Sequence, residues 1–122
     1  MSVNVNIYDV IENLKCFADE EYQCTAWLAE KGPVVSSLME DVSQLFDDTG
    51  LRIALEKNQV VFNQNVDTLL RVFRSQLLDI NQHQRPEQLI RSQKMQQIRV
   101  SATAILKLLS ALTAMDQQNA DE

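Results

Sequence analysis

The side chains best suited to chemistry in this chain are carboxylates gathered in its first fifty residues. They stand in three runs, at positions 19–21, 40–41 and 47–48. Carboxylates on two neighbouring helices can hold Mg²⁺ through one or two protein ligands, together with phosphate oxygens of a substrate. The candidate residues for a Mg²⁺-dependent phosphohydrolase are therefore Glu20, Glu21, Glu40 and Asp41.

The spacing of these acids falls short of a complete metal site. A two-helix site of this kind calls for one more acid three residues after Glu21 and another three residues after Glu40. Cys24 and Ser43 occupy those positions. A solvated acidic face, with some charges at helix ends, accounts for the same residues. We therefore expect neither a metal nor a cofactor.

Other catalytic patterns are equally incomplete. His83 is the only histidine, and Gln84, Arg85 and Pro86 follow it, so it belongs in a polar loop. A serine or cysteine nucleophile needs a base beside it, and this histidine is the only ready one. Two cysteines eight residues apart on one helix are separated by about 12 Å along its axis, too far for a disulfide. We expect a protein that is not an enzyme.

Composition favours a few long helices that position these side chains. The chain has 122 residues, the size of one domain, and 45% of them are hydrophobic. It contains only two glycines and two prolines, whereas an all-β fold needs many turns. We expect a single domain over residues 1–122.

Hydrophobic residues repeat with the period of a helix through the second half of the chain. Spacings of three and four alternate along two seams, and such spacing places each seam on one helix face. The first seam comprises Leu55, Gln59, Phe62, Val66, Leu69, Phe73, Gln76 and Ile80. The second comprises Met95, Ile98, Ala102, Ile105, Leu109 and Leu112. These seams predict an all-α fold.

Capping signals and chain breakers divide the chain into four helices. The predicted helices cover residues 7–31, 34–47, 51–82 and 87–115, between a flexible arm at 1–6 and a polar tail at 116–122. Asn6 is the expected N-cap of the first, Ser37 heads a capping box that would start the second at Leu38, and Pro86 suits the first position of the fourth. Together they predict an up-down antiparallel four-helix bundle whose third and fourth helices are longest.

Two details of these helices stay open. Near Asn58 the third helix could instead break into a short hairpin that pairs residues 52–55 with 60–62. Glu21 lies in the apolar seam of the first helix, where a buried carboxylate would need a partner such as Arg71 or Arg74. The predicted core consists of Ile11, Leu14, Phe17, Leu38, Val42, Leu45, Phe62, Val66, Leu69, Phe73, Ile98, Ile105, Leu109 and Leu112.

Charge is divided unevenly along the sequence. Residues 1–50 carry ten acids and two bases, whereas the remainder carries nine bases and seven acids, for a net charge of −6. The bases of the second half are scattered around their helices, so a nucleic-acid partner is not expected. No apolar run reaches the roughly 18 residues of a membrane span, and the first residues do not resemble a secretory signal. We expect no membrane association and a cytoplasmic location.

The last predicted helix carries more apolar surface than three neighbouring helices would cover. About 120° from its main seam runs a second stripe, composed of Val100, Ala104, Leu108, Ala111 and Met115. This stripe and Trp27 are the candidate protein interface, and homodimerisation is the expected assembly. We therefore predict a non-catalytic interaction or regulatory module. A bundle that binds a small apolar ligand in its core is a further alternative, beside the Mg²⁺-dependent phosphohydrolase.

Overall fold

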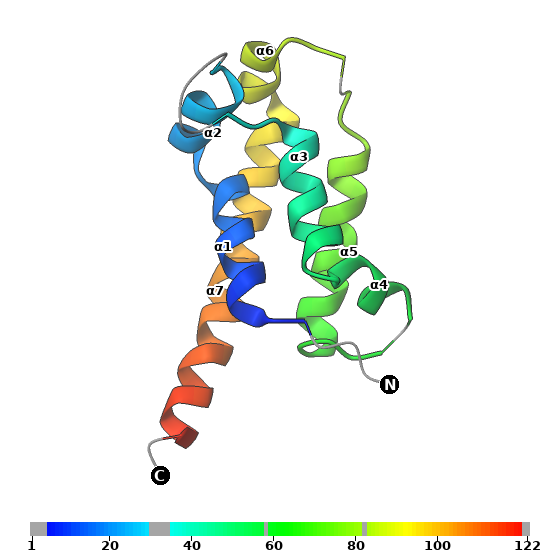
Figure 1. Ribbon diagram of the computed structural model, residues 1–122, viewed down its shortest axis with the longest axis vertical. Helices are drawn as coiled ribbons and strands as arrows, with labels where there is room; N and C mark the ends of the chain where they lie inside the picture. Colours follow the sequence, from blue (N-terminus) through cyan, green and yellow to red (C-terminus); the bar gives the residue numbers. More distant parts are fainter. Residues whose placement is uncertain (1–4, 30–34, 58, 82, 121–122) are drawn as a thin grey trace.

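All regular secondary structure in the described residues is helical, as predicted (Figure 1). The computed structural model describes residues 5–29, 35–57, 59–81 and 83–120, with 115–120 described by their backbone alone. These ranges contain seven α-helices and one π-helical turn. Their bounds are α1 (Ile7–Ala18), α2 (Glu20–Trp27), α3 (Leu38–Ser43), η1 (Gln44–Asp48, the π-helical turn), α4 (Leu51–Glu56), α5 (Gln64–Leu78), α6 (Pro86–Arg91) and α7 (Gln93–Ala120).

The predicted first helix is broken at Asp19, which is a correction to the continuous helix over 7–31. Asn6 caps α1 as predicted, because its Oδ1 accepts hydrogen bonds from the amides of Tyr8 and Asp9. Asp19 then leaves the helical conformation and caps α2 by accepting from the Tyr22 amide at 3.1 Å. The predicted end of this helix at residue 31 lies outside the described residues, as do residues 1–4 of the predicted arm.

The second predicted helix begins where its capping box placed it. Ser37 accepts from the Glu40 amide at 3.2 Å, and α3 begins at Leu38. The π-helical turn η1 continues α3 to Asp48. Gly50 follows with a φ of 79°, a left-handed conformation that glycine adopts without steric cost, and this allows the sharp turn into α4.

The third predicted helix, over 51–82, is also broken, so the continuous seam across it was wrong. Helix α4 ends at Glu56, and α5 begins at Gln64 with Asn63 as its cap. Buried Asp67 holds the connecting loop by accepting from the amides of Val61 at 2.8 Å and Phe62 at 3.1 Å. The alternative hairpin is wrong as well, because its first half is helical and no strand occurs in the described residues.

The fourth predicted helix divides at Ser92, which ends α6 and precedes α7. Its hydroxyl donates to the Leu89 carbonyl and accepts from the Met95 amide, so one side chain serves both helix ends. Pro86 is the first residue of α6, as predicted. Helix α7 continues to Ala120, beyond the predicted end at Met115 and through most of the expected polar tail. No helix within the described residues combines the length and apolarity that a bilayer span requires.

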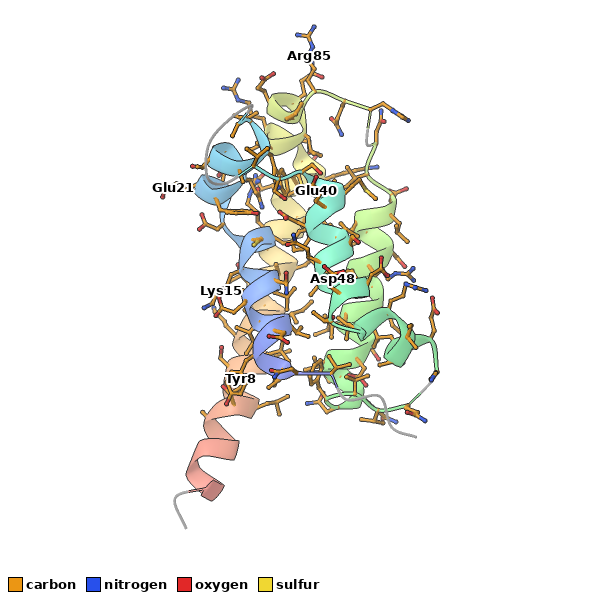
Figure 2. The ribbon with its side chains drawn as sticks, in the orientation of Figure 1. Tyr8, Lys15, Glu21, Glu40, Asp48 and Arg85 are labelled. Atoms are coloured by element: carbon orange, nitrogen blue, oxygen red, sulfur yellow. The ribbon has the colours of Figure 1, made fainter. Side chains whose placement is uncertain are left out.

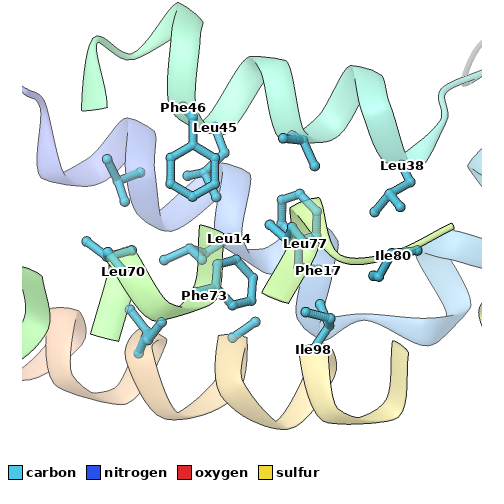
Figure 3. Close-up of a cluster of buried hydrophobic side chains, with 14 of the residues drawn as sticks. Leu14, Phe17, Leu38, Leu45, Phe46, Leu70, Phe73, Leu77, Ile80 and Ile98 are labelled. Atoms are coloured by element: carbon cyan, nitrogen blue, oxygen red, sulfur yellow. The ribbon is translucent and has the colours of Figure 1, made fainter. Parts of the chain in front are cut away.

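Helix α7 is the element on which the fold is assembled. It packs most extensively against α1 and next against α5, while α3 lies between α1 and α5 in the view of Figure 1. Phe17 and Phe73 meet edge to face between these helices, with ring centroids 5.6 Å apart and an interplanar angle of 86° (Figure 3). This arrangement is a favourable one for aromatic pairs in a core.

All fourteen predicted core residues pack in the core, ten as buried side chains and four as half-buried ones. The half-buried residues are Ile11, Phe62, Leu69 and Leu112. On α5 Leu70 is buried in place of the predicted Leu69, and the core face of α5 consists of Val66, Leu70, Phe73 and Leu77. The core face of α5 therefore keeps Val66 and Phe73 of the predicted seam and takes Leu70 and Leu77 in place of Leu69 and Gln76.

Candidate functional site

Asp41 is the one member of the predicted acidic cluster that lies in the interior. Its side chain is 2% exposed, and its two carboxylate oxygens accept three side-chain donors. The Trp27 indole donates to Oδ2 at 2.8 Å, the Ser36 hydroxyl to Oδ1 at 2.7 Å, and the Tyr22 hydroxyl to both oxygens at 3.2 and 3.3 Å. The carboxylate therefore joins α2 to α3.

Local structure brings these four side chains together. The Ser37 cap starts α3 so that Asp41 falls one turn into the helix and faces α2. The Ser36 amide donates to the Ala26 carbonyl at 3.0 Å, which anchors the chain before α3 to the end of α2. Burial, followed by the nearby Asp41 carboxylate, raises the pKa of Tyr22, so its hydroxyl stays protonated and remains a donor.

The other three acids of the predicted cluster are exposed and do not join Asp41 in a metal site. Glu20 and Glu21 lie on α2, and Glu40 on α3 (Figure 2). Among the described residues, no three His, Cys, Asp or Glu side chains are grouped so that they could hold a metal ion. The groups that donate to Asp41 are one indole and two hydroxyls of the protein, so this carboxylate already has structural partners.

Glu21 is exposed, and Gln23 occupies the interior position that the sequence had suggested for the glutamate. The break at Asp19 rotates α2 and buries Gln23 completely. Its amide nitrogen donates to the carbonyls of Cys16 and Phe17 at the end of α1, at 3.0 and 2.9 Å. Its oxygen accepts from Arg99 Nη1 at 2.8 Å, so the network reaches α7.

Arg99 completes this network and links three helices. Besides Gln23 it reaches the Ile90 carbonyl of α6, which accepts from Nη2 at 3.0 Å. Sequence reasoning missed both Gln23 and Arg99. An available signal was Asp19 followed by two acids, a pattern typical of a helix N-terminus, which would have placed the break correctly.

A small cavity lies beside the Asp41 group. It has a volume of about 100 Å³ and is lined by Trp27, Ser37, Leu38, Met39, Gln84, Pro86 and Leu89. Pockets that hold small molecules are commonly about 300–1,000 Å³. A cavity of this size gives little room for the apolar ligand considered from the sequence.

Trp27 belongs to the interior rather than to a surface shared with the α7 stripe. Its side chain is 6% exposed, and its indole nitrogen is bonded to Asp41. Packing against the core and the buried hydrogen bond account for this tryptophan, which the sequence had placed in the candidate interface.

The outer face of α7 is one apolar surface that the described part of the chain leaves uncovered. Val100 is 67% exposed, Ala104 and Ala111 are exposed, and Leu108 is half-buried against the core. The side chain of Met115 lies outside the described residues. An open groove of about 470 Å³ runs along this face, lined by Gln96, Arg99, Val100, Thr103, Ala104 and Lys107.

Helix α7 is also longer than the helices that cover it. Its 28 residues extend about 42 Å, whereas the 12 residues of α1 extend about 18 Å and the 15 of α5 about 22 Å. In Figure 1 the C-terminal turns of α7 continue past the beginning of α1 and past α5. The stripe therefore runs from a supported part of the helix onto an overhanging part.

Comparisons of this chain with protein-family models, with curated proteins and with solved structures give no match.

Proposed function

We propose that this protein is a non-catalytic interaction module that binds a second copy of itself along the outer face of α7. The observation that carries the proposal is the exposure of Val100, a large apolar side chain 67% open to solvent beside an open groove. Toward its C-terminus the same helix overhangs the rest of the molecule (Figure 1).

The order of residues on this face supports a second copy as the occupant. A two-fold axis between Lys107 and Leu108 would place two antiparallel α7 helices so that position i faces position 215 − i. Ala104 of one copy then faces Ala111 of the other, and Val100 faces position 115. Four of the five stripe positions thus face other stripe positions, while Leu108 faces Lys107 beside the axis, which gives the paired surfaces that two-fold symmetry requires. Alanines at the facing positions allow two helices to approach closely.

The interior polar groups support a role without catalysis. The described buried polar side chains are Gln23, Asp41 and Asp67, and each is engaged in hydrogen bonds that join helix ends or loops. His83 is exposed in the loop before α6. These groups hold the fold together, and α7 offers the surface on which a partner can act.

We also propose an architecture for the helices and a cellular location for the protein. We interpret α1, α3, α5 and α7 as the four members of an up-down bundle, with α2, α4 and α6 as short helices at the turns. We expect the protein to act in the cytoplasm, the compartment that keeps cysteine thiols such as these reduced.

Sedimentation velocity over a range of protein concentrations tests the proposal. We expect a wild-type dimer that dissociates on dilution, because one helix face offers less than the roughly 800 Å² per partner of a stable complex. Val100→Glu should be monomeric at all concentrations, since the interface would then bury two unpaired carboxylates. Val100 is a better position than Leu108, which is half-buried against the core and would disturb the fold.

The matched control is Val72→Glu, the same substitution at a valine on α5 that is 50% exposed. This variant should sediment like the wild type. A wild-type protein that stays monomeric throughout, or a Val100→Glu variant that still dimerises, would contradict the proposal.

A further inference from the structure

A second surface feature lies on α4 and α5, away from the face of α7. Three arginines line a groove of about 290 Å³ together with Leu55, Glu56 and Ser75. Arg52 comes from α4, whereas Arg71 and Arg74 come from α5. Because residues three apart on a helix share a face, Arg71 and Arg74 are directed to the same side of α5.

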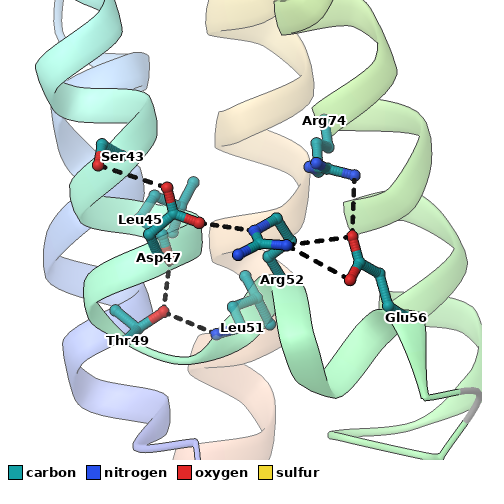
Figure 4. A network of polar contacts seen from close by, with 8 residues as sticks. All are labelled: Ser43, Leu45, Asp47, Thr49, Leu51, Arg52, Glu56 and Arg74. Atoms are coloured by element: carbon teal, nitrogen blue, oxygen red, sulfur yellow. Dashed lines mark hydrogen bonds and ion pairs between the residues drawn. The ribbon is translucent and has the colours of Figure 1, made fainter.

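Arg52 is already held by two carboxylates, one strongly and one weakly. Its Nε donates to Asp47 Oδ1 at 2.7 Å, whereas its Nη1 lies 3.4 Å from the Glu56 oxygens (Figure 4). Arg74 Nη1 lies 4.0 Å from Glu56 Oε1. Glu56 thus bridges two arginines at distances longer than the roughly 2.7–2.9 Å of a strong charged hydrogen bond.

Arg71 is held by the backbone rather than by an acid. Its Nη2 donates to the Leu55 carbonyl at 3.1 Å, near the C-terminal end of α4. Within the described residues it forms no ion pair. This hydrogen bond fixes the guanidinium at the edge of the groove and leaves other N–H groups of the side chain for a ligand.

The charges around the groove favour a doubly charged ligand. Three guanidinium groups and the carboxylates of Asp47 and Glu56 leave one positive charge in excess. The Glu56 side chain is 51% exposed, so it can turn into solvent at little cost. The groove then has an excess of two positive charges, which matches the roughly −1.5 to −2 charge of a phosphate group near pH 7.

We propose that Arg52, Arg71 and Arg74 form a binding site for a phosphate group, and that Glu56 occupies this site as an internal competitor when no ligand is bound. Planar guanidinium groups can donate two hydrogen bonds to adjacent oxygens of a tetrahedral oxyanion. Asp47 stays bonded to Arg52 and keeps it in position beside the groove. This site is separate from the dimer face, and neither proposal depends on the other.

An amide chemical-shift titration with inorganic phosphate at constant ionic strength tests this proposal. We expect saturable shifts centred on the residues around Glu56 and Arg74. Arg71→Gln and Arg74→Gln should each weaken binding by about tenfold or more, as the loss of a charged hydrogen bond predicts. Glu56→Gln should tighten binding, because it removes the competitor but keeps the shape of the side chain.

Arg91→Gln is the matched control, since it removes the same charge from an exposed arginine on α6. It should leave phosphate affinity unchanged. A parallel titration with a phosphomonoester such as glycerol phosphate distinguishes the source of the phosphate group, because the true source should bind more tightly than the other.

Acetate at equal ionic strength should give no saturable shifts in the groove. Binding of acetate as strongly as phosphate, equal affinity in the wild type and Arg74→Gln, or weaker binding by Glu56→Gln would each overturn the assignment. Circular dichroism of every variant verifies that folding is retained, and the opposite sign expected for Glu56→Gln separates loss of a ligand contact from general damage.

Discussion

The two faces of α7 have similar apolar composition and opposite environments. On the inner face Ile98, Ala102, Ile105 and Leu109 are at most 2% exposed, packed against α1 and α5. On the outer face Val100 and Ala104 are exposed along an open groove. Apolar periodicity therefore identifies which residues need to be buried. The length and position of the neighbouring helices decide which of these residues are buried within one chain.

Shortening a side chain on the inner face should have the largest effect. Ile105→Ala removes a side chain that is 2% exposed and leaves a cavity, so the free energy of unfolding should fall by about 2–5 kcal/mol. Val100→Ala on the outer face should change it by less than about 0.5 kcal/mol. Urea denaturation at a concentration where the protein is monomeric measures both values. Equal losses of unfolding free energy in the two variants would show that the inner and outer faces of α7 do not differ in burial.

Removing the buried carboxylate should have the next largest effect. Asp41→Ala leaves the Trp27 indole without its acceptor, and the free energy of unfolding should fall by about 1–3 kcal/mol. Asp48→Ala, at an exposed carboxylate of η1, should change it by less than about 0.5 kcal/mol. A small loss for Asp41→Ala would mean that solvent reaches this cluster and satisfies the indole.

Local signals along the sequence predicted helix starts well and helix continuity poorly. Asn6, Ser37 and Pro86 stand where the structure begins a helix, because each acts on backbone groups within its own first turn. The break at Asp19 was missed, and the break after Glu56 was considered only as a hairpin near Asn58, since apolar spacing continues across both in phase. A period shows which residues share a face and does not show whether the backbone between them is unbroken.

The polar residues of the interior were harder to predict than the α7 stripe. The stripe lies on one helix, so its spacing alone indicated it. The donors to Asp41 come from residues 5 to 19 positions away, and Arg99 meets Gln23 across 76 positions. Such contacts depend on the mutual packing of helices, which no local pattern encodes.

The two cysteines allow a chemical test of the difference between buried and exposed parts of the molecule. Cys16 is half-buried, and burial, with a contribution from nearby Asp41, raises the pKa of its thiol. Cys24 is exposed. Since the thiolate is the reactive form, iodoacetamide near pH 8 should modify Cys24 first, and Cys16 should become more reactive as the pH rises. Mass spectrometry of digests follows both sites.

Unfolding in urea is the control for this experiment, because it should remove the difference between the two thiols. Equal rates in the native protein would contradict the half-buried position of Cys16.

Salt should have the smallest effect, and the sign of this effect distinguishes an apolar α7 interface from one held by opposite charges. Each copy carries a net charge of −6, and Lys107 of both copies would flank the proposed axis. Because salt screens like charges, dimerisation should tighten modestly between 0.05 and 0.5 M NaCl, on the order of a few-fold. Dimerisation that weakens as salt rises would instead indicate that attraction between opposite charges of the two copies holds the interface.

The central claim is that a second copy covers the outer face of α7, and an isotope-filtered nuclear Overhauser measurement tests it most directly. In one helix the methyl groups of Ala104 and Ala111 are about 10.5 Å apart along the axis, too far for a direct signal. In a mixture of labelled and unlabelled protein, the account predicts a cross-peak between Ala104 of one copy and Ala111 of the other. The absence of this cross-peak at concentrations where sedimentation detects a dimer would contradict the claim.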